Sequence, residues 1–167
     1  MIRWLAISLA IWCAPVMAAS VPDTMRIAVP LVAKWEGKRN EAYRDIVGVW
    51  TICYGHTHDV KAGDYYTDAQ CRAMLREELE AYHLRLLPAF TAAAILPPAR
   101  HAAFDSLAYN VGVSGVSRST AVRRLNAGNI EGACQAIGWW NRAGGRVVRG
   151  LVNRRTEEVE LCMHGLR

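Results

Sequence analysis

The sequence lacks the features that mark disordered chains, repeat proteins and cysteine-based metal sites. No window of its 167 residues is dominated by serine, glycine, proline or glutamine, and no segment repeats another. It has no Cys-x-x-Cys pair and no His/Cys cluster at zinc spacing. Hydrophobic residues make up 52% of the chain and charged residues 21%, which argues against disorder and low complexity. A chain of this length can bury a core of its own, so one globular unit is expected.

The charge is basic but lacks the pattern of a nucleic-acid reader. The formal net charge is +5 and the sequence pI is about 9.1, which favours polyanions such as nucleic acid, anionic membranes or wall polymers. The arginines of the C-terminal half form neither a dense block nor a nucleic-acid motif, and nucleic acid is therefore not an expected partner. A solvated basic surface is the alternative. These arginines are Arg118, Arg123, Arg124, Arg142, Arg146, Arg149, Arg154 and Arg155.

Residues 1–19 are typical of an export segment. A short positive start at residues 1–3 precedes an apolar run over residues 4–14, and residues 16–18 are Val-Met-Ala, which suits a cleavage site. A buried N-terminal helix is the alternative, but the apolar side chains surround such a helix instead of forming one face. We therefore expect residues 1–19 to be a signal peptide or signal anchor and residues 20–167 to be the globular domain.

Hydrophobic spacing predicts a small lobe with a hairpin, followed by a helical lobe. Residues 24–37 suit an amphipathic helix ending at glycine, in which Pro30 marks either a kink or a later start. Residues 43–47 and 49–55 are rich in β-branched and aromatic side chains and are joined through Gly48, which predicts a hairpin. A capping box at residues 67–70 opens a long helix that Pro88 stops. Further helices are expected at about 97–112, 119–126, 130–141 and 146–163.

The expected fold class is thus α+β and mostly helical, with the substrate cleft between the two lobes.

Five cysteines fit an exported protein, because disulfides persist outside the cytoplasm. Cys53, on the second strand, is near in sequence to Cys71 at the start of the long helix. The two C-terminal helices that carry Cys134 and Cys162 are expected to pack together. We therefore predict the pairs Cys53–Cys71 and Cys134–Cys162, which leaves Cys13 in the apolar segment.

Two acidic residues and a threonine lie around the predicted hairpin. Glu36 ends the first helix, Asp45 lies in the hairpin and Thr51 is on its second strand. Glycoside hydrolysis needs one carboxylic acid to protonate the leaving oxygen, and a second group to stabilise positive charge or hold the attacking water. A helix end that faces a hairpin can supply both. The spacing alone is weak evidence, because surface carboxylates nine residues apart are common.

Further residues make the pattern more specific. The order Glu36-x8-Asp45-x5-Thr51, followed by Cys-Tyr-Gly-His-Thr at 53–57, resembles the catalytic segment of the phage T4-type lysozyme family, which includes the endolysins of lambdoid phages. Residues 104–112 resemble the helix that lines the family's cleft. The C-terminal tryptophan and arginine motif is similar at Trp139, Trp140, Asn141, Arg146, Arg149 and Arg155. The resemblance covers about residues 31–165.

The resemblance implies a two-lobed lysozyme fold and a muramidase that cleaves the β-1,4 bond between N-acetylmuramic acid and N-acetylglucosamine, without a metal or an organic cofactor. Glu36 would be the general acid, in a partly dehydrated pocket that raises its pKa. Asp45 would stabilise the transition state or orient water, and Thr51 would hold that water. If both carboxylates and the water fit in line, their separation would be roughly 6.5 to 9.5 Å and the reaction would invert the anomeric carbon.

The resemblance also assigns residues around the cleft. Tyr109 and Asn110 would contact acetamido groups of the glycan, and Arg146 would position Glu36 from the helical lobe. The expected partners are peptidoglycan strands and, through residues 1–19, the inner membrane, and the expected oligomeric state is a monomer.

Several nearby residues have simpler interpretations. Glu41 is expected to be a solvated surface carboxylate, and His56 and His58 turn or supporting residues instead of metal ligands. Trp139 and Trp140 are expected to pack in the core and between lobes, with sugar stacking as the alternative.

Two other function classes remain open. A lytic transglycosylase uses the same acid but lets a substrate hydroxyl replace water, so that its product ends in an anhydro sugar. Asp45 and Thr51, the water-handling positions, favour hydrolysis instead. A catalytically inactive wall-binding module or a basic membrane-active carrier would explain the charge and the export segment. It gives no reason for Glu36, Asp45 and Thr51 to occur together.

The apolar segment generates a prediction about location. As a helix, residues 4–19 span about 24 Å, short of the ~30 Å hydrocarbon core, so we predict a signal anchor that can leave the membrane into the periplasm. Cys13 could then exchange with Cys53, although a thiol in an apolar run is more often inert. Fractionation and N-terminal sequencing of the released protein test this. Full-length protein moving to the periplasm on depolarisation is expected. A mature start at Ala19 or Ser20, with no full-length soluble species, would refute it.

Overall fold

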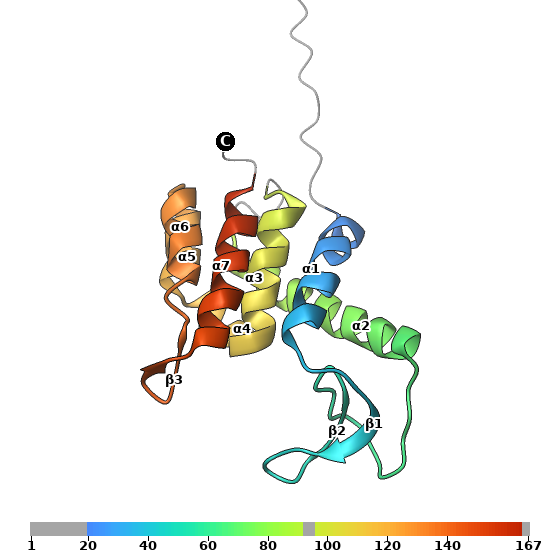
Figure 1. Ribbon diagram of the computed structural model, residues 1–167. Helices are drawn as coiled ribbons and strands as arrows, with labels where there is room; N and C mark the ends of the chain where they lie inside the picture. Colours follow the sequence, from blue (N-terminus) through green and yellow to red (C-terminus); the bar gives the residue numbers. More distant parts are fainter. Residues whose placement is uncertain (1–19, 92–95, 165–167) are drawn as a thin grey trace, which may run out of the picture.

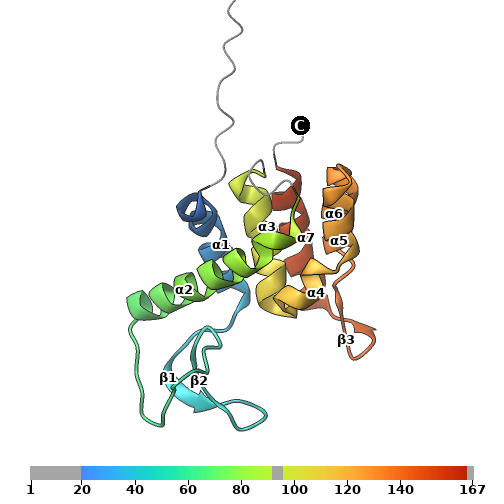
Figure 2. The same cartoon turned by 180° about the vertical axis from the view of Figure 1, so that it is seen from behind.

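The computed structural model describes residues 20–91 and 96–164, which form a hairpin-bearing lobe and a helical lobe (Figure 1). The first lobe contains helix α1 (Val21–Trp35) and strands β1 (Arg39–Arg44) and β2 (Trp50–Cys53). Helix α2 (Asp68–Leu86) runs from this lobe to the helical one, as the view from behind shows (Figure 2). The remaining elements are η1 (Leu87–Ala89), α3 (Pro98–Val111), α4 (Val113–Ser117), α5 (Thr120–Asn126), α6 (Ile130–Ile137), β3 (Arg142–Ala143), β4 (Arg146–Val147) and α7 (Arg149–Met163).

The mostly helical α+β fold with two lobes is therefore confirmed. No helix among the described residues is long and apolar enough to cross a membrane. The export segment expected at residues 1–19 lies outside the described residues.

Helix α1 begins three residues earlier than predicted and ends at Trp35, with Glu36 as its C-cap, close to the predicted end at Gly37. Ser20 caps it, because the Ser20 side chain accepts a hydrogen bond from the Asp23 backbone N–H at 3.2 Å. Pro30 stays inside the helix on an exposed position, so it neither delays the start nor ends the helix. The backbone N–H of Glu36 donates to the Val32 carbonyl at 3.0 Å, which closes the last turn.

The first strand begins four residues earlier than predicted, and the second strand is shorter than predicted. The turn between them is wider than predicted, because residues 45–49 lie between the strands instead of Gly48 alone. Strand β1 pairs antiparallel with β2, with Tyr43 opposite Thr51, and a bulge lies between Arg39 and Tyr43. The Asp45 carboxylate shapes the turn, because its Oδ1 accepts hydrogen bonds from the backbone N–H groups of Val47 at 3.0 Å and Val49 at 2.8 Å. Gly48 takes a φ of +83°, which the turn requires.

Two buried clusters hold the lobes together. The first joins α1, β2 and α2 through side chains that include Met25, Val32, Ile52, Leu75 and Leu79. The second fills the helical lobe around Phe104, Leu107, Val116, Leu125 and Ile137. Helix α3 belongs to both, because Ala102 contributes to the first cluster and Phe104 to the second. Helix α3 is therefore the element against which α1 and α7 both pack.

Both predicted disulfides are confirmed. Cys53 at the end of β2 bonds to Cys71 in the first turn of α2, and Cys134 of α6 bonds to Cys162 of α7. The first bridge ties the hairpin to α2, while the second ties together two helices of the helical lobe.

The C-terminal segment differs from the prediction. Residues 142–147 form a short hairpin whose turn uses Gly144 and Gly145 with φ of +55° and +76°, so that α7 begins at Arg149 and not at Arg146. The packing predicted for the tryptophans is right for Trp140, which lies against the helical core, and wrong for Trp139. The Trp139 side chain is 57% exposed, and the Arg124 guanidinium lies over its ring.

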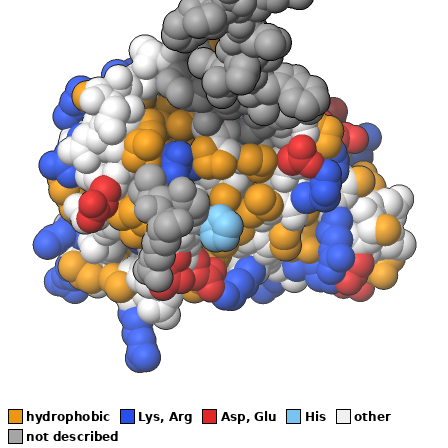
Figure 3. All heavy atoms as spheres, turned by 90° about the horizontal axis from the view of Figure 1, so that it is seen from above, with side chains coloured by type: hydrophobic (Ala, Val, Ile, Leu, Met, Phe, Trp, Pro, Cys, Tyr) orange, Lys and Arg blue, Asp and Glu red, His pale blue; other side chains and the backbone are white. Residues whose placement is uncertain are grey.

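The face seen from above mixes hydrophobic and charged side chains (Figure 3). Hydrophobic side chains show in its middle, while lysine and arginine lie mainly towards its rim. On this face the lysines and arginines are not gathered in one block.

The Cys134–Cys162 bridge generates a prediction about stability. The bridge closes a loop across 28 residues of sequence, so replacing both cysteines by alanine should lower the free energy of unfolding by about 3 to 4 kcal/mol. Urea denaturation of the parent and the double variant measures this difference. A loss below about 1 kcal/mol would show that the bridge does not constrain the unfolded chain as its length requires.

Candidate active site

Glu36 lies at the C-cap of α1, between the two lobes. Its carboxyl is 25% exposed, and Arg154 Nη1 donates a hydrogen bond to its Oε1 at 2.7 Å. Arg154 comes from α7 and its side chain is only 4% exposed. The Glu36 side chain is therefore partly buried, beside a buried cation.

A cavity of about 460 Å³ opens at Glu36. Glu36 shares its wall with Tyr109 and Asn110 at the C-terminal end of α3, as the sequence analysis expects of cleft residues. The other lining residues come from the segment after β2 and from α2: Tyr54, Gly55, Thr57, Glu78, Ala81, Tyr82 and Arg85. The cavity is thus built from both lobes, with polar side chains on every wall.

Asp45 and Thr51 lie on the hairpin and are not among the residues that line this cavity. Asp45 is partly exposed at the start of the turn. Thr51 is buried, and its hydroxyl donates to the Val49 carbonyl at 3.1 Å. The structure therefore brings together Glu36, Tyr109 and Asn110, while the two hairpin residues stand outside this group.

Arg146 is not the arginine that contacts Glu36, and this expectation is corrected. Arg146 lies on β4 and is exposed, whereas the arginine that contacts Glu36 is Arg154, one and a half turns into α7. The physical reason is the β3–β4 hairpin, which delays the start of α7 and leaves Arg146 outside the helix.

Glu78 is a second cavity carboxylate that the sequence analysis missed. Its Oε2 accepts a hydrogen bond from the Tyr109 hydroxyl at 2.9 Å, and its Oε1 pairs with His56 Nδ1. The same Tyr109 hydroxyl lies 3.2 Å from the Tyr54 carbonyl. Burial, and then the neighbouring Glu78, raise the pKa of Tyr109. Glu78 stands four residues before Tyr82, so helical spacing alone places both on one face of α2.

The histidines near the hairpin take the supporting places expected of them. His56 Nε2 lies 2.9 Å from the His58 carbonyl while Nδ1 contacts Glu78, so the ring holds the segment after β2 against α2. His58 is exposed, with Nδ1 3.0 Å from Asp59. Both belong to the turn region and neither lines the cavity.

Behind the cavity lies a buried charged cluster that the sequence analysis did not identify. Glu158 of α7 is completely buried between Arg154 and Arg155. Burial raises the pKa of Glu158, against the lowering effect of Arg155, of the Ser106 hydroxyl and of Arg154. The cluster contacts two residues of the cavity wall. Arg154 contacts Glu36, and Arg155 Nη2 donates a hydrogen bond to Asn110 Oδ1 at 2.8 Å.

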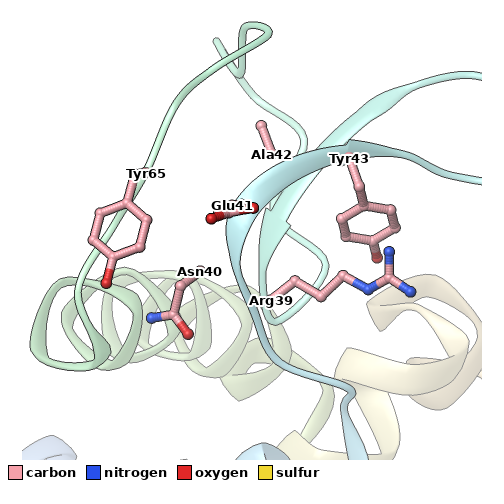
Figure 4. Close-up of a pocket in the computed structure, with 6 residues that line it drawn as sticks. All are labelled: Arg39, Asn40, Glu41, Ala42, Tyr43 and Tyr65. Carbon is pink, nitrogen blue, oxygen red and sulfur yellow. The ribbon is translucent and has the colours of Figure 1, made fainter.

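A second hollow of about 420 Å³ lies along β1, lined by Arg39, Asn40, Glu41, Ala42, Tyr43 and Tyr65 (Figure 4). The Arg39 guanidinium lies 4.3 Å from the centre of the Tyr43 ring. Glu41 is exposed here, as expected of a surface carboxylate. This hollow does not include Glu36, so it is distinct from the cavity between the lobes.

The chain is similar to known proteins along most of its length. The profile of the phage lysozyme family matches residues 33–158. A SAR-endolysin of Enterobacteria phage P21 is 40% identical over 131 residues, 78% of each chain. Among solved structures, the muramidase domain of SpmX from Asticaccaulis excentricus has a TM-score of 0.75 at 29% identity, over 83% of this chain and 95% of that one. The endolysin of Escherichia coli O157:H7 phage FAHEc1 has a TM-score of 0.74 at 30% identity, over 83% and 92%.

The two arginines compared above generate a matched prediction. Arg154→Lys keeps the charge but cannot contact Glu36, Glu158 and the Ser106 carbonyl together, so the free energy of unfolding should fall by about 2 to 4 kcal/mol. Arg146→Lys is the control and should stay within about 0.5 kcal/mol of the parent. Chemical denaturation measures both. Equal effects of the two substitutions would contradict the assignment of Arg154.

Proposed function

Because the chain belongs to the phage lysozyme family and is a lysozyme-type glycoside hydrolase, we propose that it is an endolysin muramidase with Glu36 as its general acid. The proposed bond is the β-1,4 linkage between N-acetylmuramic acid and N-acetylglucosamine, and the proposed result is degradation of the wall and lysis of the cell. The observation that carries the proposal is the position of Glu36, which opens onto a cavity lined from both lobes and is held by a buried arginine.

The Arg154 contact is compatible with an acid at Glu36. Arg154 donates to Oε1, which leaves Oε2 to hold the proton that the leaving oxygen takes. Arg154 also shares its charge with Glu158, so Glu36 does not have to be ionised to balance it. The guanidinium fixes the carboxyl in place, and the cavity side remains open to the glycan.

Asp45 and Thr51 are proposed to stabilise the transition state and to hold the attacking water. Both hydrogen bonds recorded for the Asp45 carboxylate use Oδ1, and Oδ2 can accept from a water. The Thr51 hydroxyl gives its hydrogen to the Val49 carbonyl, so towards a water it also acts as an acceptor. Two acceptors would take the hydrogens of one water and leave its lone pair for the anomeric carbon.

Tyr109 and Asn110 are proposed to bind the glycan. The Tyr109 hydroxyl is engaged by Glu78 and Tyr54, so its contribution would come from the ring. Asn110 Oδ1 accepts from Arg155, which leaves the Nδ2 group as a donor to an acetamido carbonyl. The positioning role that the sequence analysis gave to Arg146 passes to Arg154.

We further propose that residues 20–167 are the catalytic domain and residues 1–19 a signal peptide or releasable anchor. The relatives named SAR-endolysins and the composition of the segment support export to the periplasm, with an initial tether to the inner membrane. The same relatives support action on peptidoglycan. A monomer that works without a cofactor stays a prediction from the sequence.

Product chemistry separates this proposal from a transglycosylase. Hydrolysis adds water and leaves a reducing end, whereas a transglycosylase leaves an anhydro sugar. The inactive binding module would release no fragments at all. Analysis of the soluble fragments by mass spectrometry, before and after borohydride reduction, distinguishes the three.

The central prediction concerns Glu36→Gln. The amide keeps the shape of the side chain but cannot deliver a proton, so lysis in a peptidoglycan zymogram should fall by about 10² to 10⁴. Asp45→Asn should be severely impaired, and Thr51→Ala less so. The matched control is Glu41→Gln, an exposed carboxylate on β1, which should remain within about two-fold of the parent. A folded Glu36→Gln protein with substantial activity would remove Glu36 from the acid role.

A further inference from the structure

Glu158 is a completely buried carboxylate that makes its contacts with both of its oxygens. Its Oε1 accepts hydrogen bonds from the Ser106 hydroxyl at 2.6 Å and from Arg154 Nε at 3.1 Å. Its Oε2 lies 3.0 Å from Arg155 Nη1. One anion thus lies between two arginines whose side chains are 4% and 1% exposed. A buried charge is tolerated only when it is paired in this way.

Each of these arginines reaches the cavity with a different part of its guanidinium. Arg154 uses Nε for Glu158 and Nη1 for Glu36, at 2.7 Å. Arg155 uses Nη1 for Glu158 and Nη2 for Asn110 Oδ1, at 2.8 Å. Because a guanidinium is planar and rigid, holding one edge of it fixes the direction of the other. Glu158 therefore sets the orientation of two cavity side chains that it does not touch.

The charges of the cluster make Glu158 relevant to proton transfer. With Glu158 ionised, the two arginines carry one uncompensated positive charge when Glu36 is protonated. Without the carboxylate they would carry two, and the buried Arg154 would then favour the ionised form of Glu36. An acid that must hold a proton beside an arginine therefore needs a second anion behind that arginine.

We infer that Glu158 is a positioning residue, which holds Arg154 against Glu36 and balances its charge so that Glu36 can keep its proton, and which orients the Asn110 amide through Arg155. The inference rests on the proposed function of Glu36 and Asn110. Glu158 touches no substrate and takes no part in proton transfer itself. Its effect reaches the reaction through the two arginines.

Other groups around Glu36 also carry charge and must be kept constant. Glu78 and Arg85 of α2 line the same cavity, and Tyr109 of α3 lies close enough to Glu36 to be affected by its charge. Among the hydrogen bonds and ion pairs of the described residues, none joins any of them to Glu158. A substitution at Glu158 therefore changes the cluster behind Glu36 and leaves the groups in front of it unchanged.

The test is Glu158→Gln, an isosteric change that removes the charge. The pH–rate profile on purified cell walls should keep its shape while its alkaline limb moves down by roughly 0.5 to 1 pH unit, because Glu36 loses its proton more readily. Binding of triacetylchitotriose, measured by calorimetry, should weaken by about five-fold as the Asn110 amide loses its fixed direction. A residue with a merely structural role would lower the rate equally at all pH values.

Two further variants make the result decisive. Glu160→Gln is the matched control, the same substitution at an exposed position of the same helix, and should move neither the limb nor the sugar affinity. Glu158→Asp keeps the charge but is one methylene too short to contact both arginines, so it should shift both readouts in the same direction by less. If circular dichroism shows that Glu158→Gln does not fold, Glu158→Asp takes its place as the test variant.

The outcomes separate this inference from the proposed function. An alkaline limb that coincides with that of the parent in every folded Glu158 variant overturns the inference, while lysis by the parent and its loss in Glu36→Gln would still support the acid. A parent protein without lytic activity would instead overturn the proposed function. A limb shift without any change in sugar affinity would overturn the part that concerns Asn110.

Discussion

The contact between Arg154 and Glu36 connects the end of the first helix to the last helix of the chain, and the arrangement of the cavity depends on it. Glu36 sits where α1 ends and the hairpin begins, and it has no rigid element of its own beyond the helix cap. Arg154 supplies the rigidity, because α7 packs on α3, which also carries Tyr109 and Asn110. The ion pair therefore adds to the direct packing of α1 on α3 and fixes the Glu36 carboxyl relative to the cavity residues of α3.

The charged groups behind the cavity are unusual, because two arginines and a carboxylate are buried there instead of being exposed to water. Glu158 and its two arginines occupy the interior face of α7, where apolar side chains would be expected. Such a cluster gives less stability than hydrophobic packing of the same volume. The cluster instead holds the Arg154 guanidinium in a fixed position next to Glu36.

Much of the fold was predictable because local signals agreed with tertiary packing. The capping box at Thr67, the serine cap at Ser119 and the stop at Gly112 each mark a helix boundary that the structure shows. The β3–β4 hairpin was missed, although Gly144-Gly145 is a turn signal, because the arginines after it suit a helix equally well. Arg146 was assigned from its resemblance to the family's tryptophan and arginine motif, whereas the helix that starts at Arg149 brings Arg154 to Glu36.

The residues of the site were predictable only where they belong to a sequence motif that resembles a known family. Glu36 and the pair Tyr109-Asn110 lie in segments that resemble a known family, and they share one cavity. Glu78 and Glu158 belong to helices whose sequences look like ordinary amphipathic surfaces, and the contacts that place these two carboxylates involve residues far away in the chain. The spacing of Arg154, Arg155 and Glu158 over one turn was the available signal for a paired cluster.

The Asp45 carboxylate shapes its turn in a way that restricts how the length of this loop can vary. One oxygen of this carboxylate organises the backbone from Val47 to Val49, while the Ile46 side chain at the tip is fully exposed. Insertions or deletions here would move the carboxylate together with the backbone it holds. Many side chains should therefore be tolerated at position 46, whereas the length of the loop should be kept.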